Sequence, residues 1–317
     1  MGEIDRILDR FELSSSATAS AIHMAGRLFL GIADNGHCAS FVVGNSSGRI
    51  LATGMGGSVN HHYWGREHAR ASLRHLVNQI PGWGRRSSLA GACITYKADF
   101  TVGEWRVSDL VSGILEEVQV KVEDFATSSI LGMHGSQERL LLVGGHSAQA
   151  IYEDSLGNQN QIRQDCLAWS PVMRLNEKIN GMERLHPQRC MKDLQYMKAQ
   201  IGLGKCLSTF TDVLDHLVSQ GSLSALELAY DWAHDLVQMV IAMSSHVRTF
   251  NPVIGLYGQV LLGSQTIRSR VHHLLGLLFP RCRIIDSPLA PATGAYLSAV
   301  LTGKSAHKHE VITNAFA

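Results

Sequence analysis

The feature that most constrains the fold of this chain is a short pattern that occurs twice. Gly36-His37-Cys38-Ala39 and Gly145-His146-Ser147-Ala148 each follow an apolar run, and a second glycine turn comes 12 residues after the first, at Gly48 and at Gly157. The two copies are 109 residues apart. Each copy predicts strand, tight turn, strand, turn and strand, because Asn, Asp and Gly residues that tolerate positive φ separate the apolar runs. The chain is therefore expected to be a duplicated α/β protein.

The two glycine turns also suggest a binding function. Matching turns in two related halves can face each other across a cleft, and their exposed backbone N–H groups can form a concavity that binds an anion. This geometry suits a phosphate.

Composition sets wide limits on the protein class. With 317 residues and 45% hydrophobic content the chain can bury a full core, and its length favours two domains. A net charge of +1 gives no electrostatic reason to expect nucleic acid or an anionic membrane as a partner. No apolar run approaches the roughly 20 residues of a membrane span, and the first residues lack the layout of a signal peptide. The expected location is the cytoplasm.

Cysteine and histidine usage argues against a metal-bound framework. The six cysteines contain no Cys-x-x-Cys pair, which disfavours a zinc ribbon, an iron–sulfur cluster and a disulfide scaffold, so reduced thiols are expected. The sixteen histidines include adjacent pairs that make poor chelates, and most of them are expected to be structural or exposed.

Hydrophobic periodicity predicts alternating strands and helices along the chain. Residues 1–26 are expected to form a peripheral helix and linker, 27–135 the first domain, 136–303 the second domain and 304–317 a loose tail. Strands are expected at 28–33, 40–44, 50–53, 89–95, 118–122, 140–143, 148–152, 253–257 and 283–285. Helices are expected at 64–80, 108–118, 126–132, 223–246 and 265–278 and from 293. Asp124 then stands where a strand gives way to a helix, at the sheet edge where open α/β sheets bind ligands.

Six local patterns stand in a recognisable order. They are Gly31-Ile32-Ala33-Asp34-Asn35-Gly36, Gly56-Gly57-Ser58-Val59-Asn60-His61, Val122-Glu123-Asp124-Phe125-Ala126, Gly144-Gly145-His146-Ser147, Ile254-Gly255-Leu256-Tyr257-Gly258-Gln259 and Pro291-Ala292-Thr293-Gly294-Ala295. Residues 27–303 in this order resemble the sugar kinase, actin and heat-shock-chaperone superfold. Within it, they resemble the group of N-acetylglucosamine kinases and benzoyl-CoA reductase activator ATPases.

The resemblance implies an α/β fold of two ribonuclease-H-like, or actin-like ATPase, domains with a central cleft. It implies ATP and Mg²⁺ as cofactors and phosphoryl transfer to a sugar, similar to an amino sugar, or to another small hydroxylated substrate. Asp124 would be the catalytic base that accepts the proton of the attacking hydroxyl, and Asp34 would orient Mg²⁺ or its waters. Relatives are often dimers, so a homodimer is expected.

The resemblance also implies binding residues for each ligand. Those for the nucleotide are Asp34, Asn35, Gly36, His37, Gly144, Gly145, His146, Ser147, Gly258 and Gln259. Those for the substrate are Gly57, Asn60 and His61.

Departures from the family pattern leave alternatives open. His37 and His146 stand where the phosphate loops normally have small residues, so they either face the cleft or pack outward from turns that tolerate His. Asp124 could serve only as a helix N-cap, and Asp34 and Asn60 only as turn residues. Cys38 is expected to be a buried thiol.

Three classes of function remain open. The first is the kinase, and the second is a pseudokinase or regulatory protein of the same fold that has lost ATP hydrolysis. The third is a reductase-activating ATPase, which the scattered cysteines disfavour.

Overall fold

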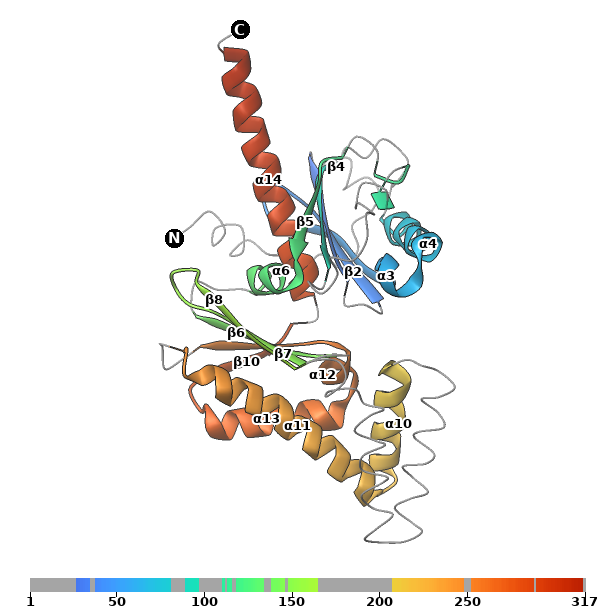
Figure 1. The fold of residues 1–317 in the computed structure, drawn as a ribbon, viewed down its shortest axis with the longest axis vertical. Helices are drawn as coiled ribbons and strands as arrows, with labels where there is room; N and C mark the ends of the chain where they lie inside the picture. The colour runs from blue at the N-terminus through green and yellow to red at the C-terminus, as the bar shows by residue number, and fades with distance from the viewer. Residues whose placement is uncertain are drawn as a thin grey trace. The chain divides into compact units, whose positions relative to one another are not determined.

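A computed structural model describes residues 27–34, 38–80, 89–96, 110–111, 113–115, 118–133, 138–145, 148–164, 207–247, 252–287 and 289–315. The chain divides into two compact units (Figure 1). One unit ends at Ser136 and is completed by Leu289–Ala317, and the other spans Gln137–Pro288. The expected helix in 1–26 and most of the expected helix at 108–118 lie outside the described residues.

The first unit is built on a five-stranded sheet. Its strands are β1 (Leu28–Asp34), β2 (Cys38–Asn45), β3 (Ile50–Gly57), β4 (Leu89–Tyr96) and β5 (Val120–Asp124). The order across the sheet is β3-β2-β1-β4-β5. β1 pairs antiparallel with β2, and β2 with β3, whereas β1 pairs parallel with β4, and β4 with β5.

The second unit repeats this topology strand by strand. Its sheet consists of β6 (Arg139–Gly144), β7 (Ala148–Glu153), β8 (Gln159–Gln164), β9 (Val253–Tyr257) and β10 (Arg283–Asp286), in the order β10-β9-β6-β7-β8. The β6–β7 and β7–β8 pairs are antiparallel, and the β6–β9 and β9–β10 pairs are parallel. The predicted duplication is therefore confirmed at the level of strand order and direction.

Even the second turn of each copy has the same hydrogen bonds. In the first copy Asn45 Oδ1 accepts from the backbone N–H groups of Ser47 and Arg49, at 3.0 and 3.1 Å. In the second copy Asp154 Oδ1 accepts from those of Leu156 and Asn158, at 2.9 Å each. Gly48 and Gly157 follow with φ of 95° and 85°. A short polar side chain that bonds to the backbone two residues on, followed by glycine at positive φ, fixes both hairpins.

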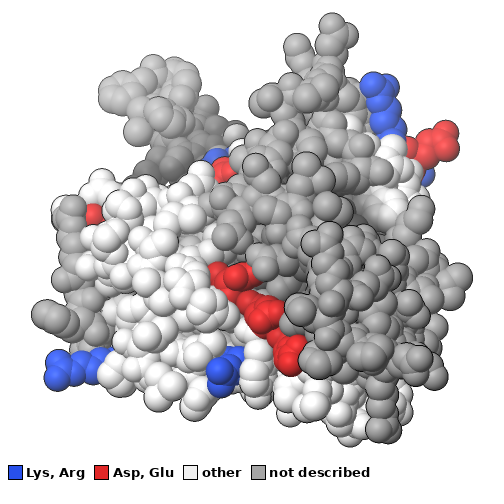
Figure 2. Space-filling model, turned by 60° about the horizontal axis from the view of Figure 1, so that its bottom comes forward, with Lys and Arg blue, Asp and Glu red and all other residues white. Residues whose placement is uncertain are grey.

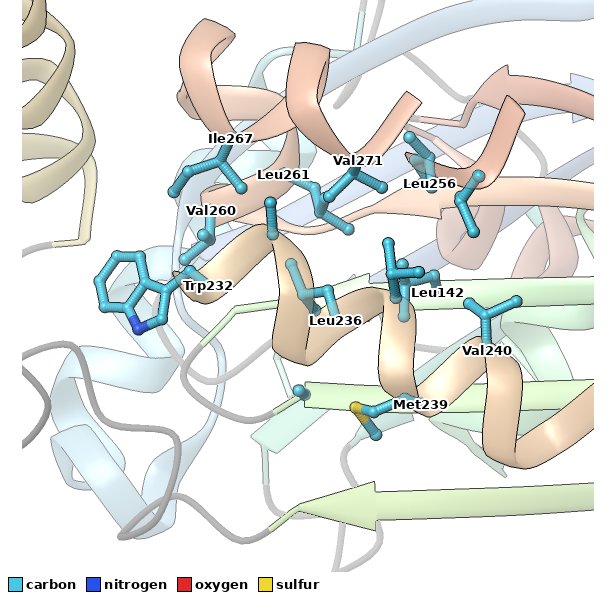
Figure 3. Packing of buried hydrophobic residues seen from close by; sticks show 14 of the residues in the cluster. Leu142, Trp232, Leu236, Met239, Val240, Leu256, Val260, Leu261, Ile267 and Val271 are labelled. Atoms are coloured by element: carbon cyan, nitrogen blue, oxygen red, sulfur yellow. The ribbon is translucent and has the colours of Figure 1, made fainter. Parts of the chain in front are cut away.

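Helices pack on the sheet of each unit and complete its hydrophobic core. In the first unit, α4 (Arg66–Asn78) buries Ala69, Leu73, Leu76 and Val77 at helical spacing. In the second, the core is formed by the sheet with α10 (Leu207–Ser219), α11 (Leu223–Ser244), α12 (Gln259–Gly263) and α13 (Gln265–Leu278). Figure 3 shows Trp232, Leu236 and Val240 of α11 directed at residues of the sheet, α12 and α13.

The last helix, α14 (Ala290–Ala315), packs on the first sheet and on α6 (Phe125–Leu131). The sequence grouped residues up to 303 with the second domain and expected a loose tail beyond them, but the structure differs in both respects. A Cβ on Gly31 would overlap the backbone of Tyr296 and Ala292, and one on Gly294 would overlap the Ser128 carbonyl oxygen. Glycine at these positions therefore allows α14 to approach β1 and α6 at backbone distance.

Charged side chains are sparse among the described residues of the face drawn in Figure 2. On the face in Figure 2, the visible Lys and Arg side chains of the described residues stand apart, and acidic side chains form one short row. Among the described residues, no helix is both long enough and apolar enough to cross a membrane.

We predict that Gly294→Ala will lower the free energy of unfolding by about 2–3 kcal/mol, because the added methyl group has no space against the α6 backbone. Gly276→Ala in α13 is the matched control, since nothing lies within 4 Å of its Cβ position. The control should raise stability by up to about 1 kcal/mol through helix propensity. Urea unfolding measures both, and equal effects would contradict the packing explanation.

Candidate functional site

One edge of the first sheet collects the predicted catalytic, metal and substrate residues. β1, β3, β4 and β5 run in one direction, so all of them end at the same edge. Asp34 ends β1, Gly57 ends β3 and Asp124 ends β5. The carboxyl edge of an open α/β sheet is where such folds bind ligands.

Asp34 is buried, with a relative exposure of 1%, and its carboxylate binds the segment after β3. Ser58 Oγ donates to both carboxylate oxygens, at 3.0 and 2.8 Å, and the Val59 backbone N–H donates to Oδ2. Ser58 Oγ in turn accepts from the backbone N–H of Asn60, whose side chain is also buried. The predicted metal residue and the predicted substrate residue thus belong to one hydrogen-bonded group.

Ser58 is a residue of this group that the sequence did not single out. Its signal is weak, since a serine two residues before Asn60 reads as an ordinary turn residue. Only the pairing of β1, β2 and β3 brings it to Asp34, which is 24 residues away in the chain.

An aromatic pair lies beside the predicted substrate segment. The Trp64 ring, at the end of α3 (His61–Trp64), stacks on His68 of α4 with ring centroids 5.4 Å apart and 29° between the planes. His68 Nε2 is 3.7 Å from the position of a Cβ on Gly57. Trp64 is 45% exposed, and His61 is half-buried. The sequence missed Trp64 and His68, although an aromatic pair four residues apart, directly after Asn60, is a usable signal.

Asp124 is the N-cap of α6. Its Oδ2 accepts from the backbone N–H groups of Ala126 and Thr127, at 2.8 and 3.2 Å. The N-cap interpretation of Asp124 is therefore confirmed, and so is the predicted change from strand to helix at this residue. Both bonds go to one oxygen and leave Oδ1 outside the cap. Capping and proton transfer are compatible roles for such a carboxylate.

A polar cluster lies on the face of the sheet that α14 covers. Lys121 Nζ donates to Glu123 and to Ser298 Oγ, both at 2.8 Å, and Ser128 Oγ donates to the other oxygen of Glu123, also at 2.8 Å. Burial, together with the charge of Glu123, raises the pKa of the buried Cys93 thiol to about 12. Cys93 is therefore a neutral thiol in this structure rather than a nucleophile.

At the corresponding edge of the second unit, glycines stand where β6 and β9 end. β6 ends at Gly144, and its neighbour β9 is followed by Gly258, which has a φ of 107°. A Cβ on Gly258 would overlap the Gly144 carbonyl oxygen. Gly145 follows β6, and Gln259 begins α12. Four of the predicted nucleotide-binding residues are thus brought together at the ends of two adjacent parallel strands.

The remaining predicted nucleotide-binding residues are Asn35, Gly36, His37, His146 and Ser147, and they lie outside the described residues. Within the described parts of the chain, no group of three or more His, Cys, Asp and Glu side chains could hold a metal ion. The metal role of Asp34 therefore stays a prediction.

We expect Asp34→Asn to lower the free energy of unfolding by about 2 kcal/mol. The amide would present an N–H₂ group to donors that now bind a carboxylate. Asp124→Asn is the matched control, and it should change stability by only a few tenths of a kcal/mol, because Asn is an equally good N-cap. Chemical unfolding at pH 7 compares them. Similar losses in the two variants would mean that the contacts of Asp34 carry no special stability.

The raised pKa of Cys93 predicts loss of stability at alkaline pH. The unfolded thiol ionises near its ordinary value of 9.0, whereas the folded thiol holds its proton up to about 12. The stability that this group contributes is therefore full below pH 9 and is lost as the pH rises from 9 toward 12. Between pH 9 and 11, Cys93→Ala should flatten the fall of unfolding free energy by roughly 1 kcal/mol per pH unit. Equal slopes for variant and wild type would exclude Cys93 as the cause.

Comparison with known proteins identifies the fold. No protein-family model matches the sequence, and no curated protein matches it by sequence. Among solved structures, a Chromobacterium violaceum protein designated an N-acetylglucosamine kinase matches with a TM-score of 0.58 at 13% identity. The match covers 86% of this chain and 98% of that one. A ROK family glucokinase from Streptomyces griseus, in complex with glucose and AMPPNP, has a TM-score of 0.55 at 15% identity, covering 86% and 99%. The activator of 2-hydroxyisocaproyl-CoA dehydratase from Clostridium difficile, with bound ADPNP, has a TM-score of 0.52 at 12% identity, covering 89% and 97%. The predicted superfold is therefore confirmed: this chain has the duplicated α/β fold that sugar kinases share with actin-like ATPases.

Proposed function

We propose that this protein is an ATP-dependent phosphotransferase that acts on a sugar, similar to an amino sugar, or on another small hydroxylated substrate. The observation that carries the proposal is the common edge of the first sheet, where Asp124, Asp34 and the Asn60 segment end up together. Phosphoryl transfer needs groups that position the reactants and neutralise charge, together with a carboxylate near the attacking hydroxyl.

Asp124 is proposed as the general base. Its cap bonds to Ala126 and Thr127 fix the carboxylate at the start of α6, and Oδ1 takes no part in them. A carboxylate held in this way can accept a proton from a hydroxyl placed beside Oδ1. Asn60 and His61 are proposed to bind the substrate from the neighbouring segment.

The edge of the second unit that contains Gly144, Gly145 and Gly258 is proposed to bind nucleotide phosphates. Gly145 is partly exposed and has no Cβ, so a phosphate could approach its backbone closely, whereas Gly144 and Gly258 are buried and pack against each other beneath it. The ADPNP and AMPPNP complexes of proteins with this fold support nucleotide binding as the first property to test.

Asp34 is suited to contact Mg²⁺ through the waters bound to the ion rather than directly. The Ser58 hydroxyl proton is shared between its two oxygens and the Val59 N–H donates to Oδ2, so both oxygens already have partners and little room is left for direct coordination. Mg²⁺ in phosphate sites usually keeps several waters, so a carboxylate can act by orienting them. The ion would neutralise phosphate charge, and Asp34 would hold its waters and the Asn60 segment in place.

A second candidate is a pseudokinase or regulatory protein of the same fold. It is favoured by His37 and His146, because the resemblance implies small residues at these two positions of the phosphate loops and this sequence has a Cβ and an imidazole there. Nucleotide binding separates the two candidates. With Mg²⁺, ATP or ADP at about one hundred times its Kd adds roughly 2.7 kcal/mol of stability and raises the melting temperature. No shift at millimolar nucleotide would favour the pseudokinase.

If nucleotide binds, Asp124→Asn should lower the rate of phosphoryl transfer by roughly 10²- to 10⁴-fold and leave nucleotide affinity unchanged. Asp286→Asn is the matched control, because Asp286 ends β10, the strand equivalent to β5, and contacts Arg268 and His272 instead. Coupled ADP-release assays over a panel of sugars and amino sugars provide the measurement. Full turnover in Asp124→Asn would remove this residue as the base.

A further inference from the structure

The second unit contains a pocket at the amino ends of its parallel strands, opposite the glycine edge. Its volume is about 460 Å³, within the range of small-ligand sites. Leu140 near the start of β6 and Ile254 near the start of β9 belong to its lining, with Val240 of α11. All three are buried core residues. The pocket therefore reaches the hydrophobic core rather than lying as a shallow groove on the surface.

The rim of the pocket combines apolar and cationic character. Leu278, Phe279 and Pro280 form part of it where α13 ends, followed by Arg281 and Cys282 before β10. Leu278 is 50% exposed, and its neighbour Leu277 is 66% exposed, so the rim presents apolar side chains to solvent.

The described part of the pocket rim carries positive charge. Among the described residues that line the pocket, Arg281 alone is charged, and it forms no ion pair with another described residue. Ser244, the other polar residue of the wall, already donates to the Ile241 carbonyl oxygen at 2.6 Å. An apolar interior with a single guanidinium at its mouth complements a molecule with an apolar body and one carboxylate.

We propose that this pocket binds a medium-chain aliphatic carboxylate, with the chain against Leu140, Val240 and Ile254 and the carboxylate at Arg281. Burial of the apolar chain against these side chains supplies the affinity. The guanidinium supplies the preference for an anion over a neutral alcohol. The site lies on the opposite edge of the sheet from Gly144 and Gly258, so it is independent of the proposed phosphotransferase.

Decanoate is the probe, with decanol as its neutral counterpart. Calorimetry of the full chain should show saturable decanoate binding, weakened roughly fivefold by Arg281→Gln, with decanol binding unchanged. Arg283→Gln is the matched control, because Arg283 is also exposed but does not line the pocket. Ser244→Phe should fill the pocket and abolish binding of both probes, whereas Ser245→Phe, at the neighbouring exposed position, should not.

Alkylation of Cys282 gives a local readout that does not depend on global stability. Decanoate should slow maleimide modification of Cys282 at least fivefold in wild type, as followed by peptide mass spectrometry, and should have no effect in Ser244→Phe. Absence of saturable binding at millimolar decanoate would overturn the proposal. So would binding that Ser244→Phe and Arg281→Gln both leave intact, since the fatty acid would then bind elsewhere.

Discussion

The close backbone packing of α14 against β1 and α6 holds the candidate site of the first unit together. Side chains cannot fill this contact, because a Cβ on Gly31 or Gly294 would overlap backbone atoms of the opposite element. The contact fixes β1, which ends at Asp34, and α6, which begins after Asp124. The two carboxylates that matter most for the proposed chemistry therefore depend on glycines with no chemistry of their own.

Burial of Asp34 adds a second constraint. A carboxylate removed from water is costly unless hydrogen bonds replace its hydration, and here Ser58 and the Val59 N–H group provide them. The cost is tolerated because the same bonds fix the loop after β3 and, through Ser58, the backbone of Asn60. A change at Asp34 should therefore affect both the predicted metal role and the predicted substrate segment, so loss of activity in such a variant would not by itself assign either.

Local sequence patterns were sufficient to predict the duplication and the positions of many strands. Turn residues around Gly48 and Gly157, apolar runs and the Asp124 boundary predicted the strands and the duplication, because each depends on neighbours within a few residues. The sequence could not predict that α14 returns to the first sheet or that Ser58 reaches Asp34, since both depend on contacts between distant segments. The sequence analysis also predicted a loose tail after Gly303, whereas α14 continues to Ala315 through a stretch without proline. The Trp64–His68 pair was visible as a spacing, but stacking depends on how α3 meets α4.

The duplicated units differ most where their strands end, and this difference bears on function. Asp34 ends β1, but the residue 109 positions later is Val143, followed by Gly144. Asp124 ends β5 and caps a helix, whereas Asp286 ends β10 and lies near Arg268 and His272. The first sheet therefore has carboxylates at the ends of β1 and β5, whereas the carboxylate that ends β10 in the second sheet is engaged by two basic side chains. The edge at β6 and β9 has no carboxylate at its strand ends, so an anionic phosphate would meet backbone groups there without repulsion. In the proposed phosphotransferase, the first sheet would serve the hydroxyl substrate and the second sheet the nucleotide, because a proton acceptor requires a carboxylate whereas a phosphate is repelled by one.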